Sequence, residues 1–201
     1  MQEEENNKIF EVIGHALQRM SVSISLVGIE TLIQLLQEDE EKHLWRTRSY
    51  DFSYTLIEIL CTIGTPEALR AVKDFSQSVI QTFQGAEHQS VYARAKYMLR
   101  HIVTQTFHGI NSTTATRLTP EGQRRIHVVA KDIVSTLIQL LKGESEIVPN
   151  RVAEVLVELG RQDKTYRGVK KVIPVLRSAK EEDPDKFVRL RAEKVLERIQ
   201  P

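Results

Sequence analysis

Apolar residues recur along this chain at helical spacing, in stretches separated by polar or turn-forming residues. Between residues 7 and 20 they form one broad stripe, which predicts an amphipathic helix. The same periodicity continues along the chain, and no stretch shows the period-two alternation of a strand. The further expected helices cover residues 26–37, 54–63, 66–83, 88–107, 120–142, 148–159, 166–179 and 184–199. The expected fold class is therefore all-α.

Turn-forming residues mark several helix boundaries. Gly64 follows an apolar run and suits a left-handed helix C-cap. Thr65 and Pro66 then suit the N-cap and the first position of the next helix, which predicts a tight turn between antiparallel helices. The other expected connections are an acidic turn over 38–41, a loop over 42–51 and an Asn-, Ser- and Thr-rich loop over 109–119.

The second half of the chain repeats the first, helix by helix. Residues 31–36 (TLIQLL) return unchanged as residues 136–141, and the later helices correspond in the same order. A chain that repeats a helical hairpin stacks into a solenoid, which offers surface rather than a central cavity. We expect one array over residues 1–201, with a capping helix in 1–25, repeats 1 and 2 in 26–108, an interrupting loop over 109–119, and repeats 3 and 4 in 120–201.

Composition is that of an ordinary globular protein, with 41% hydrophobic and 27% charged residues. The single cysteine, Cys61, excludes an internal disulfide and is compatible with a reducing compartment. Its apolar neighbours predict a buried, inert thiol. No apolar window approaches the length of a membrane span, and the N-terminus is acidic where a signal peptide would be basic. We therefore expect a cytoplasmic chain without membrane insertion.

The net charge of +1 hides an uneven distribution of charge. Residues 1–44 carry nine acids against three bases, whereas residues 91–131 carry seven bases and one acid. Regions of opposite sign can steer an acidic partner or support self-association. Solvated helix faces would give the same pattern.

The last expected hairpin has a distinctive spacing. Asp183 and Pro184 open a turn, and the helix after it carries Val188-Arg189, Ala192, Leu196 and Ile199. This spacing resembles the HEAT-repeat superfamily, particularly its bacterial HEAT-like branch, which is also found in phycobilin lyases. The resemblance implies an α-solenoid of about four HEAT-like hairpins plus an N-terminal capping helix. It also implies that Asp183 and Arg189 join successive repeats, and that the second helix of each hairpin lines a concave surface.

Two groups of residues are candidates for binding a partner. Arg94, Arg151 and Arg191 align in three second helices, where a column of guanidinium groups would suit carboxylate or phosphate. Alternatively, each of these arginines binds an acid or a helix end of a neighbouring repeat. Trp45 with Arg46 and Arg48 forms an aromatic and basic cluster of the kind that dominates many interfaces, or Trp45 folds back over the first repeat. Further candidates from the basic stretch are Arg100, Arg124 and Arg125.

Catalytic and metal-binding patterns are missing from the sequence. No histidine pair has the helical i, i+4 spacing with an acidic third ligand that a zinc site would show, so surface or capping histidines are expected. The sequence also lacks a phosphate-binding glycine loop, a nucleophile elbow and paired cysteine ligands. We expect no catalytic residues, no cofactor and no metal.

These observations favour a non-catalytic scaffold that binds a protein or peptide on its concave second-helix surface. One alternative is nucleic-acid binding through the basic region 91–131, as in the base-excision glycosylases that use HEAT-like repeats. A further alternative, which the resemblance allows, is a bilin-lyase-like chaperone that handles a tetrapyrrole.

Overall fold

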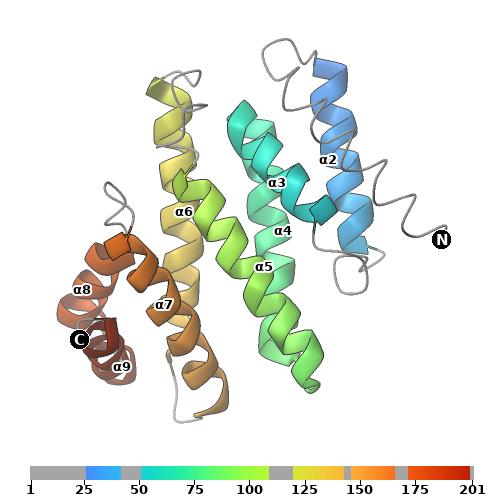
Figure 1. Ribbon diagram of the computed structural model, residues 1–201. Coiled ribbons are helices and arrows are strands. Elements are labelled where there is room, and N and C mark those ends of the chain that lie inside the picture. Colours follow the sequence, from blue (N-terminus) through green and yellow to red (C-terminus); the bar gives the residue numbers. More distant parts are fainter. Residues whose placement is uncertain (1–25, 42–50, 109–119, 143–145, 166–171, 200–201) are drawn as a thin grey trace. The chain divides into compact units, whose positions relative to one another are not determined.

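The computed structural model describes residues 26–41, 51–108, 120–142, 146–165 and 172–199 (Figure 1). Every regular element in these residues is an α-helix, which confirms the all-α class. The helices are α2 (Leu26–Glu41), α3 (Asp51–Ile63), α4 (Pro66–Gly85), α5 (Gln89–His108), α6 (Pro120–Gln139), α7 (Ile147–Thr165), α8 (Val172–Glu182) and α9 (Lys186–Ile199). The expected helix over 7–20 and most of the expected loops over 42–51 and 109–119 lie outside the described residues. None of the described helices combines the length and the apolar content that crossing a membrane requires.

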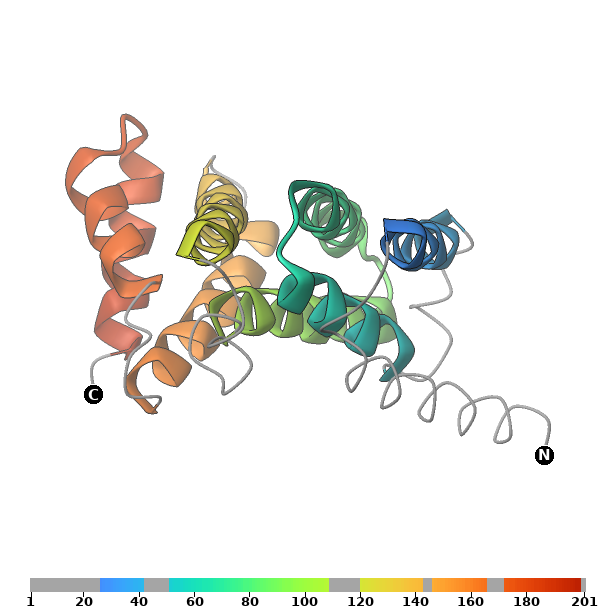
Figure 2. The same ribbon diagram turned by 90° about the horizontal axis from the view of Figure 1, so that it is seen from above.

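The chain divides into two compact units, residues 1–126 and 127–201, and the division falls within α6. In the first unit α2 packs against α3 and α4 against α5, as the expected hairpins require. In addition, α2 packs against α4 and α3 against α5. Figure 2 shows α2 and α4 in one row and α3 and α5 in a second. Successive hairpins of this unit therefore place their first helices together and their second helices together.

In the second unit α8 and α9 form a hairpin, and α7 packs against both helices. The end of α6 contacts the same hairpin, because the Gln139 side-chain amide donates to the Asp183 carboxylate over 2.9 Å. α7 and α9 share a close contact in their C-terminal halves, where Gly160 lies against Ile199. The second unit thus also sets one second helix, α7, against the next, α9.

Apolar side chains on the inner face of each helix form the core. On α4 the apolar residues that recur at helical spacing are all buried, and they are Leu69, Val72, Phe75, Val79 and Ile80. Removing apolar surface of this kind from water is worth about 25 cal/mol per Å². The helical periodicity of the sequence therefore identifies the core face of α4 correctly.

The turn between α3 and α4 has the expected caps. Gly64 has a φ of 67°, and its N–H donates to the Leu60 carbonyl over 3.1 Å. The Thr65 hydroxyl accepts from the N–H of Ala68 over 3.3 Å, and Pro66 is the first residue of α4. Gly is favoured here because a residue with a Cβ is strained at positive φ.

Several expected helix boundaries differ from the structure, and two of the differences have a clear local cause. α2 continues through residues 38–41, where we expected a turn, and Asp39 is buried with its carboxylate accepting from the Ser53 hydroxyl over 2.5 Å. No Gly or Pro interrupts that acidic run, so nothing local ends the helix. α9 begins at Lys186 rather than Pro184, because the Asp185 carboxylate caps it by accepting from the N–H of Phe187 over 2.8 Å.

The expected end of α7 at Leu159 is also wrong. Gly160 follows an apolar run as Gly64 does, but α7 continues through it to Thr165. The residues after Gly160 include no N-cap and proline pair like Thr65-Pro66 that would start a new helix. In place of a cap, Gly160 provides a close helix contact, since a Cβ built there would lie 2.2 Å from Ile199 Cδ1.

Candidate partner-binding faces

The three aligned arginines all lie half-buried on second helices, Arg94 on α5, Arg151 on α7 and Arg191 on α9. Arg191 Nη1 donates to the Leu141 carbonyl over 2.6 Å, just beyond the last residue of α6. Carbonyls at a helix C-terminus lack intrahelical donors, so a cation is favourable there. For Arg191 the structure thus shows the alternative interpretation, a contact with a helix end of the neighbouring hairpin.

Large exposed apolar side chains gather on the same helices. Within the described residues these side chains are Tyr97 on α5, Val128 on α6, Ile147 on α7 and Leu190 on α9. Three of the four therefore lie on second helices, and each of the three is within four residues of an aligned arginine. The sequence periodicity did not identify these apolar positions as exposed.

The middle of α5 carries three basic residues, Arg94, Lys96 and Arg100, and none of its 20 residues is Asp or Glu. The guanidinium carbon of Arg100 lies 5.4 Å from the centroid of the exposed Tyr97 ring. An arginine this close to an aromatic ring is in cation–π range. The first unit therefore presents an aromatic and cationic face on its second row of helices.

The remaining basic candidates differ in their surroundings. Arg124 and Arg125 are exposed in the second turn of α6. Arg125 Nε lies 3.3 Å from Glu121 Oε1, an exposed i, i+4 pair that offsets part of the positive charge of this stretch. Trp45, Arg46 and Arg48 lie outside the described residues.

One face of α9 combines cations with large apolar side chains, and we call it the α9 stripe. Its residues are spaced so that they share a helix face, which lies beside the face formed by the buried Val188, Ala192, Val195, Leu196 and Ile199. The exposed Glu197, three residues after Lys194 and seven after Leu190, lies on the same outer side of α9. The α9 stripe consists of Phe187, Leu190, Arg191, Lys194 and Arg198.

The turn before α9 joins it to α6 in a way that differs from the expected Asp–Arg contact. The Asp183 carboxylate accepts from Gln139 of α6, whereas Arg189 Nη1 donates to the Asp183 main-chain carbonyl over 2.6 Å. Arg189 therefore closes its own turn, and Asp183 makes the link to the neighbouring hairpin.

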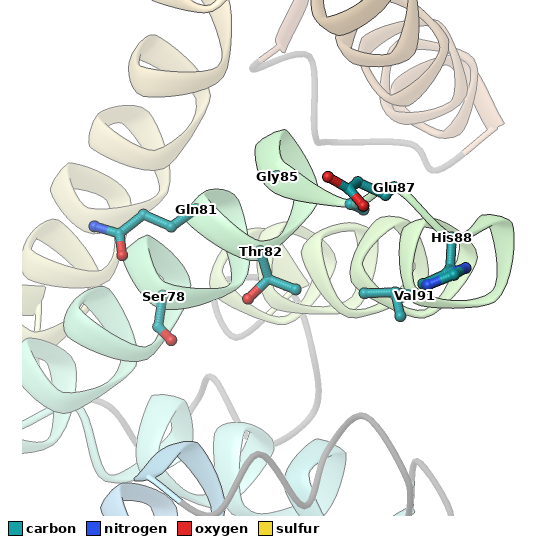
Figure 3. Close-up of a pocket in the computed structure, with 8 residues that line it drawn as sticks. Ser78, Gln81, Thr82, Gly85, Glu87, His88 and Val91 are labelled. Atoms are coloured by element: carbon teal, nitrogen blue, oxygen red, sulfur yellow. The ribbon is translucent and has the colours of Figure 1, made fainter.

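A shallow, open depression of about 470 Å³ lies beside the α4–α5 turn (Figure 3). Its lining includes the polar side chains of Thr82, Glu87 and His88, and also the half-buried Val91. An open surface keeps these groups in contact with water, so it does not supply the desolvation by which active sites shift pKa values.

Two chemically interesting side chains lie inside the first unit. The His101 ring stacks on the Tyr54 ring, with centroids 3.9 Å apart, and its Nε2–H donates to the Tyr54 carbonyl over 3.3 Å. Burial lowers the pKa of His101 to about 4, and nearby Arg100 lowers it further against the opposing effect of that hydrogen bond. We expected surface or capping histidines, whereas His101 is half-buried on α5 and stacks on Tyr54 of α3.

Cys61 is buried, as the sequence predicted. Burial, with a smaller effect of Glu58, raises the pKa of its thiol to about 12, so the reactive thiolate is disfavoured. Within the described residues no three His, Cys, Asp or Glu side chains come together as a metal site would require.

A search of protein-family models and a search of curated proteins each found no match to this chain. Its function is therefore inferred from its residues and their arrangement.

Proposed function

We propose that this chain is a non-catalytic scaffold that binds a protein or peptide partner through the exposed faces of its second helices. In this proposal the hairpins stack as a HEAT-like α-solenoid with the second helices along its concave side. The observation that carries the proposal is that three of the four large exposed apolar side chains in the described residues, Tyr97, Ile147 and Leu190, lie on second helices, each within four residues of an aligned arginine.

The residue types on these faces support binding rather than simple exposure. Single apolar side chains scattered over a surface are ordinary and need no explanation. Aromatic residues and arginine, however, are enriched in protein interfaces and supply most of their binding hot spots. Tyr97 with Arg100, and Phe187 with Arg191, bring the two types together at cation–π distance on α5 and α9.

Packing brings neighbouring second helices together within each unit, as it does the first helices α2 and α4. In the first unit α3 lies directly against α5, and in the second unit α7 lies against α9. A partner that contacts one second helix would therefore meet its neighbour within the same unit. Adjacent anchors of this kind increase the contact area available without any rearrangement of the scaffold.

Position-specific photocrosslinking tests the proposal. A benzophenone amino acid is placed at Tyr97 or Leu190 on second helices, and at the matched exposed positions Gln77 of α4 or Val128 of α6 on first helices. We expect discrete protein adducts in cell lysate from the two second-helix positions and none from the first-helix positions. Equal adducts from both sets, or none from either, would refute the proposal.

One observation also favours nucleic acid as a second candidate partner. α5 combines three Lys and Arg residues and the exposed Tyr97 with a complete lack of acids, which suits a phosphate backbone and a stacked base. Phosphate-driven binding weakens steeply as the salt concentration rises. A salt titration with single-stranded and duplex DNA tests this second candidate. If the chain binds neither DNA at low salt, nucleic acid is excluded as the partner.

A further inference from the structure

We draw no further inference here: the strongest candidate, the open depression beside the α4–α5 turn, is lined by the acidic Glu87, the exposed His88 and uncharged polar side chains, so nothing in the described residues shows which ligand or partner it would take.

Discussion

Acidification should destabilise the first unit through His101, which lies between α5 and α3. Its ring stacks on Tyr54, and burial lowers its pKa from 6.5 to about 4. The folded chain therefore favours the neutral imidazole more strongly than the unfolded chain does. The stability that this preference supplies is fully present above pH 6.5 and is lost as the pH falls from there toward 4.

The size of the effect follows from the two pKa values. A difference of one pKa unit corresponds to about 1.4 kcal/mol, and the full depression sets an upper limit of roughly 3 kcal/mol. Between about pH 7.5 and about pH 5, the protonation of the unfolded chain should reduce the free energy of unfolding by about 2 kcal/mol. Carboxylates that titrate in this range also make the free energy of unfolding depend on pH. A variant without the histidine is therefore needed to separate its contribution from theirs.

His101→Phe keeps an aromatic ring against Tyr54 and removes the titrating group. Urea denaturation followed by circular dichroism, repeated across this pH range, measures the free energy of unfolding. We expect the wild type to lose about 2 kcal/mol more than this variant between the two pH values. His88→Gln, at an exposed position, should behave as the wild type does. Equal pH slopes for the wild type and His101→Phe would refute the reasoning.

Two other positions give equally direct tests. Gly160→Ala should destabilise the chain by roughly 1–2 kcal/mol, since overpacking against Ile199 outweighs the better helix propensity of Ala. Ile199→Val removes the atom 2.2 Å from the new Cβ but keeps the one at 2.9 Å, so it should relieve part of this loss. Gly85→Ala, which has no atom within 4 Å of its Cβ, is the control, and a Gly160→Ala variant as stable as this control would contradict the close contact. The single thiol of Cys61 should resist Ellman's reagent in the native chain at mildly alkaline pH and react fully in urea, because it is buried with a pKa near 12. Rapid stoichiometric reaction of the native chain would contradict this burial.

The local pattern of residues was enough to predict the helical class, the inward face of α4 and the caps at Gly64 and Thr65. Each of these features depends on neighbours within one or two helical turns, so the sequence carries the necessary information. The same local reasoning failed at Gly160, although the apolar run before it matches the run before Gly64. Gly64 is followed by residues that begin a new helix, whereas Gly160 is followed by residues that continue the old one.

In the candidate sites, too, some features could be predicted from local sequence and others depended on tertiary packing. The sequence predicted Arg191 on a second helix, either for binding a partner or for contacting a neighbouring repeat. Only the folded chain shows that its guanidinium donates to the Leu141 carbonyl, 50 residues away. Nothing in the sequence indicated that His101 would stack on Tyr54, since the pair is separated by 47 residues. Periodicity assigns a residue to a helix face, but the neighbouring helices decide whether that face is covered. The exposure of Leu190 and the pairing of Glu193 of α9 with Lys180 of α8 were therefore decided by tertiary packing alone.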